Sequence, residues 1–275
     1  MTETRKAELM RIAYEIRKGA VTAVYSASSG HPGGSLSIAE ILTYLFFEEM
    51  NIDPKNPDKP DRDRFVLSKG HAAPGLYSAL AHRGYFPVED LKTFRQVASV
   101  LQGHPAMKHI PGVDMTTGSL GLGISAAWGM ARAAKYKKED WRVYTIIGDG
   151  ESEEGQVWEA VMFAAHYKLD NLTVFVDWNG LQIDGPIADV MNPTPFDEKF
   201  RAFGWNVIDV ADGNDVEQIY DAIMRACACQ GKPSCLILNT VKGKGATFAE
   251  ATGAHSSQPT PEQWEEAIAA AQAAL

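Results

Sequence analysis

The segment Gly148-Asp149-Gly150 most constrains how this chain can fold, because an expected strand ends there and an expected helix begins. A short apolar run with β-branched residues predicts the strand over residues 141–147, and apolar residues at helical spacing predict the helix over 151–167. Parallel α/β sheets bind ligands at the carboxyl ends of their strands, and a helix N-terminus favours anions. The glycines let the backbone approach a phosphate closely. Asp149 adds negative charge, so a phosphate here would need a divalent cation to bridge it to the carboxylate.

A second expected strand, residues 171–176, leads into Asp177-Trp178-Asn179-Gly180-Leu181. The 28 residues between Gly150 and Asn179 make one helix plus one strand, so both ends return to the same edge of the sheet. Asp149 and Asn179 can therefore offer two oxygens to one Mg²⁺ ion, and the Leu181 carbonyl can offer a third. The alternative is an ordinary turn followed by an unrelated asparagine loop, but a partner at the correct distance favours the metal site. Gly-Asp-Gly, one βα unit and then Asn is the pattern of a thiamine diphosphate site.

The bulk composition bounds the remaining possibilities. The chain has 275 residues, of which 45% are hydrophobic, and we expect residues 1–275 to form a single domain. A net charge of −9 argues against nucleic acid as a partner. The polar first residues lack the apolar core of a signal peptide, and no apolar run reaches membrane-spanning length. Cys227, Cys229 and Cys235 fit neither a disulfide framework nor a zinc site, which favours free thiols and a cytoplasmic location.

Strands and helices alternate along the chain. This alternation predicts an α/β fold with a mostly parallel β-sheet flanked by helices on both faces. The strands are expected over residues 64–68, 141–147, 171–176, 206–210 and 234–240. The helices are expected over residues 4–27, 35–50, 72–83, 88–94, 124–136, 151–167, 196–203 and 215–228, with a capped amphipathic helix from residue 260 that packs on the body or on a partner.

Four histidines lie in loops and are candidates for the same site. His31, His71 and His104 each have a glycine beside them, and His255 follows the last expected strand. All four loops can converge on the diphosphate, and imidazoles suit chemistry in which hydroxyls exchange protons near neutral pH. Zinc is a rival use, but no zinc-ligand spacing links these residues. By contrast, His82, His109 and His166 are interpreted as structural or solvated.

One further motif is set aside. The segment Lys242-Gly243-Lys244-Gly245 could bind phosphate, but it lacks the P-loop pattern, so we interpret it as a flexible turn after a strand.

Taken together, these motifs resemble the N-terminal, diphosphate-binding domain of transketolase. They appear in the family order and cover the chain to about residue 257. The matching stretches are residues 29–34, 61–68, 70–71, 94–96, 103–105, 116–121, 148–150, 179–185 and 203–205. Two departures stand out: the family's Gly-Pro-Leu-Gly-Gln-Gly reads Gly-Ser-Leu-Gly-Leu-Gly at 118–123, and a histidine expected shortly after His255 is absent.

The resemblance implies the thiamine diphosphate-binding fold of the diphosphate-binding (PP) type, and a role for each matching residue. Asp149, Asn179 and the Leu181 carbonyl would hold Mg²⁺ or Ca²⁺. The other cofactor contacts it implies are the Gly150 amide, His71 and His255 for the diphosphate, the backbone of Gly118 and Leu120, and Ile183 beneath the thiazolium ring. His31, His104 and His255 would hydrogen-bond the sugar, with His71 beside them, and Glu154 would link the two cofactor sites across a subunit interface.

The implied activity is transfer of a two-carbon ketol unit from a ketose or its phosphate to an aldose or its phosphate. The pyrimidine-binding and C-terminal domains of a full transketolase have no counterpart in these residues. We therefore expect one subunit of a split transketolase, completed by a C-terminal transketolase subunit in a heterotetramer with two copies of each chain.

Other interpretations stay open. The chain could belong to another ketol-transferring thiamine enzyme, such as dihydroxyacetone synthase or a specialised phosphosugar or sulfosugar transketolase. A 2-oxo acid dehydrogenase subunit would not need the four histidines, and deoxyxylulose phosphate synthase fits the segment around His31 badly. A non-catalytic cofactor-binding subunit is the alternative from a different class, although a scaffold has no need for Asp149, Asn179 and the loop histidines.

Overall fold

The computed structural model describes residues 1–183, 185–250, 255–256 and 258–273, and five parallel strands form its main sheet. Their order across the sheet is β1-β2-β3-β7-β6. The strands are β1 (Arg64–Leu67), β2 (Val143–Gly148), β3 (Leu172–Trp178), β6 (Asn206–Val210) and β7 (Ser234–Asn239). After β3 comes a small antiparallel ribbon of β4 (Leu181–Gln182) and β5 (Gly185–Pro186). The expected mostly parallel sheet is confirmed.

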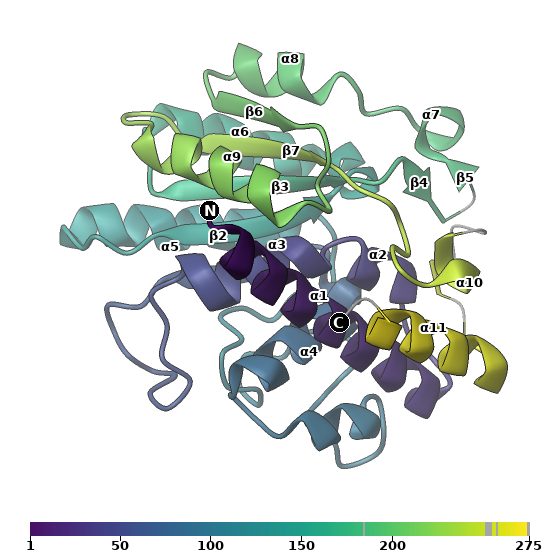
Figure 1. The fold of residues 1–275 in the computed structure, drawn as a ribbon. Helices are drawn as coiled ribbons and strands as arrows, with labels where there is room; N and C mark the ends of the chain where they lie inside the picture. The colour runs from purple at the N-terminus through teal and green to yellow at the C-terminus, as the bar shows by residue number, and fades with distance from the viewer. Residues whose placement is uncertain (184, 251–254, 257, 274–275) are drawn as a thin grey trace.

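Helices cover both faces of this sheet (Figure 1), as the alternation of strands and helices predicts. The first face is covered by α1 (Glu3–Ala27), α3 (Ala39–Tyr44), α4 (Ala73–Arg83) and α9 (Val216–Ala228). The opposite face is covered by α5 (Leu122–Lys137), α6 (Gly155–His166) and α8 (Phe196–Ala202). Short helical segments lie at the loops: η2 (Gly70–Ala72), η3 (Val88–Thr93), η4 (Gly150–Glu153) and α7 (Ile187–Val190).

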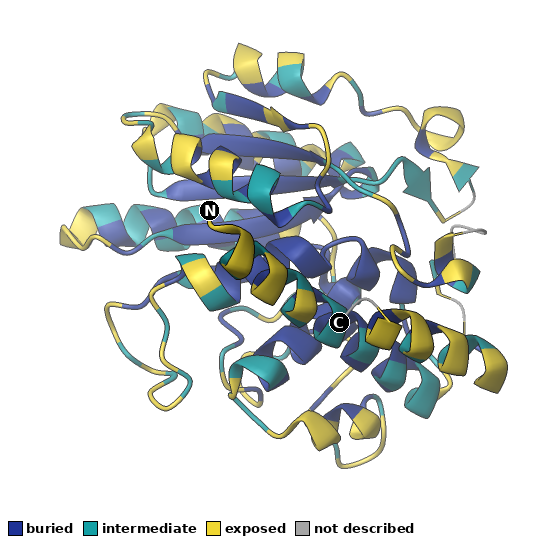
Figure 2. Ribbon diagram, in the orientation of Figure 1, coloured by how far each residue is buried: buried dark blue, intermediate teal, exposed yellow. Residues whose placement is uncertain are grey.

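Burial on both faces explains why the strands are apolar throughout. Successive side chains of a strand point to opposite faces. In β2, Tyr144 and Ile146 pack with the helices of the first face, whereas Val143 and Ile147 pack with those of the second. Figure 2 shows the buried strands between helices whose exposed residues face outward. An alternation of apolar and polar residues, typical of half-exposed strands, is therefore absent.

Two expected helices are interrupted. The helix expected over residues 35–50 is instead divided into α2 (Pro32–Leu36), α3 and the π-helix η1 (Leu45–Glu49), with a turn at Ser37. The turn matters because the Ser37 hydroxyl donates to the Asp177 carboxylate, 2.8 Å away. The helix expected from residue 151 starts as the short 3-10 segment η4, and α6 begins only at Gly155. Glu154, between them, has an extended backbone with φ −67° and ψ 126°.

The C-terminal part packs on α1. Helix α10 (Thr247–Glu250) precedes α11 (Pro261–Ala273), whose Trp264 ring stacks on Tyr25 with 5.0 Å between ring centroids. The Trp264 indole N–H also donates to the Thr22 hydroxyl. The tail helix therefore packs on the body of this chain, which was one of its two expected positions. None of the described helices is long and apolar enough to cross a membrane.

The register of the strands brings their carboxyl ends level. Gly148 at the end of β2 pairs with Asp177 of β3, and Asp177 pairs with Leu238 of β7. The loops that follow these strands must therefore meet at one edge of the sheet, which is where ligands bind in parallel α/β proteins.

Candidate active site

A cavity of about 210 Å³ lies at this edge of the sheet. Loops from distant parts of the chain line it, including those after β1, β2, β3 and β7. The sequence-predicted site residues that line it are His71, Gly118, Leu120, Asp149, Gly150, Asn179, Leu181, Ile183 and His255. The remaining predicted residues, His31, His104 and Glu154, lie outside its lining.

Asp149 joins the loops that follow β2 and β3. Its carboxylate, 4% exposed, accepts hydrogen bonds from the backbone N–H of Gly150 at 2.8 Å and of Gly180 at 2.7 Å. Within the described residues these two amides are its hydrogen-bond donors, and no cationic side chain is paired with it. Burial raises the pKa of Asp149 to about 6, and the neighbouring Asp177 carboxylate adds to the rise. The Lys69 charge lowers this pKa in part, so the side chain is a buried carboxylate that the protein stabilises only partly and without an ion pair.

The other two oxygens expected to bind a metal lie in the same cavity. The Asn179 amide oxygen accepts from the Leu181 N–H at 3.2 Å, and the Leu181 carbonyl accepts from the Lys242 ammonium at 3.0 Å. Carboxylate, amide and carbonyl oxygens are the ligands that hard divalent cations prefer. The buried Asp149 carboxylate also has no ion-pair partner among the described residues. These three oxygen groups therefore fit a divalent cation.

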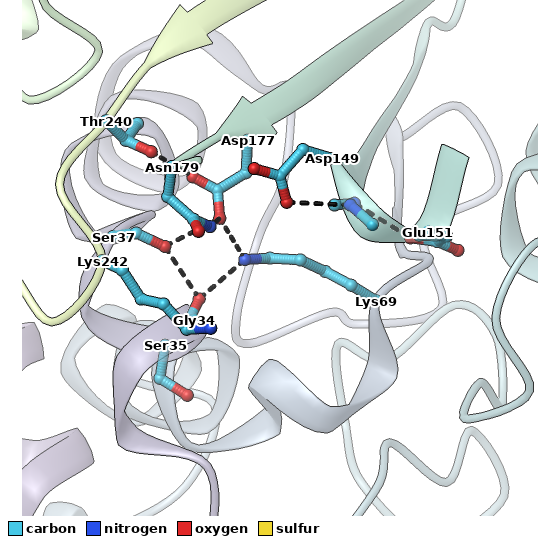
Figure 3. Close-up of polar contacts among 12 residues, drawn as sticks. Gly34, Ser35, Ser37, Lys69, Asp149, Glu151, Asp177, Asn179, Thr240 and Lys242 are labelled. Atoms are coloured by element: carbon cyan, nitrogen blue, oxygen red, sulfur yellow. Dashed lines mark hydrogen bonds and ion pairs between the residues drawn. The ribbon is translucent and has the colours of Figure 1, made fainter. Parts of the chain in front are cut away.

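A second buried carboxylate stands beside the first, and sequence analysis did not single it out (Figure 3). Asp177 is fully buried and accepts hydrogen bonds from Lys69, Ser37, Thr240 and the Asn179 amide. Burial alone would raise the pKa of Asp177, but the Lys69 charge and these hydrogen bonds hold it below its ordinary value. Because the Asn179 amide N–H donates to Asp177, this network also orients the Asn179 side chain.

Asp177 was expected in the loop after its strand, but it is part of β3. A charged residue can lie in this buried strand because Lys69, itself 1% exposed, pairs with it and also donates to the Gly34 carbonyl at 2.8 Å. The only signal in the sequence is a polar residue at the end of an apolar run, next to the Asn-Gly-Leu segment.

Glu151 is another site residue that sequence analysis missed. Its buried carboxylate accepts from the Ser68 hydroxyl, from the Gly121 N–H at 2.9 Å and from the Gly148 N–H at 3.0 Å. These bonds tie the end of β1, the glycine-rich loop 118–123 and the end of β2 to one side chain. Glu151 thereby holds the loop that carries Gly118 and Leu120 against the cavity.

The four loop histidines come together. The centroid of the His31 ring lies 5.3 Å from that of His71, 6.3 Å from that of His104 and 5.1 Å from that of His255. The His71 and His255 rings are 5.1 Å apart. Among the described residues, no group of three or more His, Cys, Asp or Glu side chains has the arrangement of a metal site.

These imidazoles are neutral near pH 7. Burial lowers the pKa of His31 to about 4, assisted by His255 and Arg95, and burial lowers the pKa of His255 to about 4, assisted by Lys242. For His71, burial and the Lys69 charge lower the pKa to about 2. A neutral imidazole both donates and accepts a hydrogen bond, which suits contact with hydroxyl groups.

Arg95 determines which nitrogen of His31 carries the proton. One guanidinium nitrogen of Arg95 lies 3.4 Å from His31 Nδ1, and another donates to the Ser29 hydroxyl. Because a guanidinium only donates, Nδ1 must be the acceptor, and the proton of the neutral ring is on Nε2.

Several predicted residues are exposed to solvent. Ile183 is 65% exposed, and Leu120, His104 and Glu154 are exposed as well. Glu154 precedes α6, and its side chain lies against Gly121, where an added Cβ would come within 2.9 Å of it.

Residues 242–245 form a turn after β7, as expected, and Lys242 in this turn is held inside the protein. Its side chain is 3% exposed and lines the cavity. The turn is held in place because the Gly243 N–H donates to the Gly33 carbonyl at 3.0 Å. Burial lowers the pKa of Lys242. Of the histidines set aside, His109 and His166 are exposed and His82 is part of a different pocket.

Comparison with known proteins identifies the family. The family model described as transketolase, thiamine diphosphate binding domain, matches residues 9–272. The chain is 49% identical over 263 residues to SqwG of Clostridium sp. (strain MSTE9), which is named as a 6-deoxy-6-sulfo-D-fructose transketolase subunit, and the match covers 95% of each chain. It is 42% identical over 253 residues to an apulose-4-phosphate transketolase subunit from Phocaeicola vulgatus, covering 92% of this chain and 89% of the relative.

Solved structures agree. Transketolase from Leishmania mexicana superposes with a TM-score of 0.91 at 34% identity, and the match covers 96% of this chain but 41% of that one. Transketolase from Campylobacter jejuni gives 0.90 at 34% identity, covering 96% and 43%. The chain thus spans about two fifths of the solved transketolases that it matches. It belongs to the transketolase family and corresponds to the family's thiamine diphosphate binding domain.

Proposed function

We propose that this chain, as one domain over residues 1–275, is the diphosphate-binding subunit of a transketolase whose pyrimidine-binding half is a separate polypeptide. Two relatives whose names contain the word subunit have nearly the same extent, since the matches cover 95% and 89% of their lengths. We further propose that the two polypeptides form a heterotetramer with two copies of each, and that the enzyme is cytoplasmic, in keeping with the free thiols of Cys227, Cys229 and Cys235.

The cofactor would be held at the edge of the sheet. Asp149, Asn179 and the Leu181 carbonyl would bind Mg²⁺ or Ca²⁺. The groups proposed to contact thiamine diphosphate are the Gly150 N–H, His71, His255, Gly118, Leu120 and Ile183. The observation that carries this proposal is the union in one cavity of three oxygen ligands, one of them on a buried carboxylate without a cation, beside four clustered histidines.

When bound, thiamine diphosphate supplies the carbanion chemistry by which a carbon–carbon bond breaks and forms. The protein orients the sugar and moves protons. His31 carries its proton on Nε2, because Nδ1 accepts from Arg95, and can donate to a sugar oxygen. His104 and His255 would hydrogen-bond other sugar oxygens, and the exposed Glu154 would reach the second cofactor site across the subunit interface. Neutral imidazoles suit groups that gain and lose protons near neutral pH.

The decisive experiment is reconstitution. The purified chain alone should show essentially no ketol transfer, whereas adding the partner polypeptide, thiamine diphosphate and Mg²⁺ should restore it. The control is His109→Ala, because His109 is exposed and lies outside the cavity. With the partner and cofactors added, this variant should show the same ketol transfer as the wild-type chain. Ketol transfer by this chain alone would contradict the division of the site between two polypeptides.

A second candidate concerns the sugar. Because the relative at 49% identity is named for 6-deoxy-6-sulfo-D-fructose and another for apulose 4-phosphate, a specialised sugar transketolase is the alternative to one acting on common ketose phosphates. A panel of 6-deoxy-6-sulfo-D-fructose, apulose 4-phosphate, D-xylulose 5-phosphate and D-fructose 6-phosphate as donors distinguishes them by kcat/KM. A preference for either of the last two would contradict the specialised function.

A further inference from the structure

Arg95 lies in a tight loop that reaches the histidine cluster without lining the cofactor cavity. Its backbone is left-handed, with φ 58°, a conformation that residues other than glycine rarely adopt. The Arg95 N–H closes the loop by donating to the Leu101 carbonyl at 2.9 Å. Strained backbone of this kind clusters at functional sites, so the contacts of the Arg95 side chain deserve a functional explanation.

The Arg95 guanidinium connects two loops that come from distant parts of the chain. One of its nitrogens donates to the Ser29 hydroxyl, and another lies 3.4 Å from His31 Nδ1. The guanidinium also packs against Gly103, where an added Cβ would come within 2.8 Å of the Arg95 Nε. It is therefore held between the loop that carries His31 and the loop that carries His104.

The loop that carries His104 is also anchored by a residue of α4. The Tyr77 hydroxyl donates to the carbonyl oxygens of Gln102 and His104, both at 2.9 Å, and the Tyr77 ring is fully buried. The main chain at His104 is thus fixed without Arg95. The part of Arg95 that nothing else replaces is its hold on the His31 side chain relative to this loop.

Arg95 also adds a positive charge beside the imidazoles. The groups that face His31 are the His71, His104 and His255 rings and the Arg95 guanidinium. Among the described residues that act on the charge of His31, none is an acid. Burial lowers the pKa of His31 and of His104, and the Arg95 charge lowers both further. Arg95 therefore favours the neutral rings, which both donate and accept hydrogen bonds.

We propose that Arg95 is a positioning residue for ketol transfer. It binds Ser29 and His31 together beside the His104 loop, and so fixes the direction in which the His31 Nε2–H donates to the sugar. Its effect reaches the sugar through His31. The inference rests on the proposed function, because that function supplies the sugar which His31 contacts.

The first measurement uses the full chain without cofactor or partner, so it does not depend on the proposed function. Long-range ¹H–¹⁵N spectra of the chain labelled with ¹⁵N-histidine follow each imidazole as the pH falls, and His31→Gln identifies the His31 signals. In Arg95→Met the pKa of His31 should rise by about one pH unit, because the repelling charge is gone. Arg95→Lys keeps the charge and should leave this pKa near the wild-type value. The control Lys92→Met, at an exposed lysine in η3, should match wild type.

The second measurement is ketol transfer by the chain assembled with its partner, thiamine diphosphate and Mg²⁺. Arg95→Met should lower kcat/KM about 30-fold, and the acidic limb of its pH profile should move upward with the pKa of His31. Arg95→Lys should keep the wild-type acidic limb and still lose about tenfold in kcat/KM, because an ammonium lacks the planar fork that binds two partners. The affinity for thiamine diphosphate should be that of wild type in both variants, and Lys92→Met should match wild type throughout.

A general loss of structure would weaken cofactor binding as well, so an unchanged cofactor affinity identifies positioning. The inference is overturned if Arg95→Met leaves the pKa of His31 unchanged, keeps wild-type kcat/KM or weakens cofactor binding. Full recovery of kcat/KM by Arg95→Lys also overturns it, and this variant decides alone if circular dichroism finds Arg95→Met unfolded. If the assembled wild-type enzyme transfers no ketol unit, the proposed function itself fails and the inference falls with it.

Discussion

The ends of β2 and β3 carry two buried carboxylates that the protein treats in opposite ways. Asp149 accepts from two backbone amides and has its pKa raised to about 6 by burial. Asp177 is paired with Lys69, and its pKa is held below the ordinary value. It lies on the strand next to β2, where it pairs with Gly148, the residue before Asp149. Burial is nearly the same for both. The difference therefore lies in the partners that surround each carboxylate.

This difference distinguishes a carboxylate that stabilises the fold from one that is suited to bind a ligand. Asp177 is neutralised by the chain's own groups, so it belongs to the folded structure whether or not a ligand is present. Asp149 has no ion-pair partner among the described residues, so a bound cation can neutralise it more fully than the protein does. A buried carboxylate without an ion-pair partner therefore indicates a ligand site better than one that is paired, such as Asp177. The two carboxylates should therefore differ in how much each contributes to the free energy of unfolding.

The largest loss is expected for Asp177→Asn. The substitution leaves the Lys69 ammonium buried and without its counter-charge, which costs about 3–5 kcal/mol. Chemical denaturation of the cofactor-free chain measures it. The double variant Lys69→Met with Asp177→Asn removes both charges and should recover more than half of this loss. If Asp177→Asn lowers the free energy of unfolding by less than about 1 kcal/mol, the Lys69–Asp177 ion pair does not stabilise the fold as expected.

A smaller effect is expected from pH, through the histidines on the ligand side. The pKa of His71 in the folded chain is about 2, below its ordinary 6.5. The unfolded chain therefore gains a proton as the pH falls below 6.5, and the folded chain does not. Stability is full above this pH and is lost as the pH falls, by about 2 kcal/mol at pH 5 relative to pH 7.

The measurement is Tm against pH for wild type and His71→Gln. The variant has no titrating group at this position, so its Tm should fall less between pH 7 and pH 5. Parallel curves would mean that the His71 ring takes up its proton as readily in the folded chain as in the unfolded one.

The smallest change in stability is expected for Asp149→Asn. The substitution removes a charge that burial disfavours, but it also leaves one of the two backbone N–H donors facing an amide NH2. Because these effects oppose each other, the free energy of unfolding should change by no more than about 1 kcal/mol. Metal-dependent binding of thiamine diphosphate by the assembled enzyme should nevertheless be lost. Calorimetric titration with and without Mg²⁺ measures the binding. A loss of several kcal/mol in stability would place Asp149 with Asp177 in the scaffold and end the contrast between them.

Much of the site was accessible from sequence because its signals are local. Gly148-Asp149-Gly150 and Asn179 are separated by one helix and one strand, and that spacing alone returns them to the same edge of a parallel sheet. The same logic brought the four histidine loops together, since each loop follows or precedes a regular element. Interruptions such as the turn at Ser37 were missed because apolar spacing continues across them.

The charged partners were not accessible in this way. Lys69 and Asp177 are 108 residues apart in the sequence, and Lys242 and Leu181 are 61 apart. In the sequence, Lys242 is part of a glycine-rich turn, and nothing near it signals burial. Its position depends on hydrogen bonds that the neighbouring Gly243 and Val241 make to Gly33 and Asn214, which belong to other parts of the chain.

The sequence by itself determined the parallel α/β architecture, the edge of the sheet that carries the candidate site and the resemblance to transketolase, because periodicity and spacing act over one or two elements. Only the tertiary structure decided which buried charges neutralise one another and which remain for a ligand. The physical reason is that electrostatic compensation depends on distance and burial in space, and the pairs that matter here are formed by residues far apart along the chain.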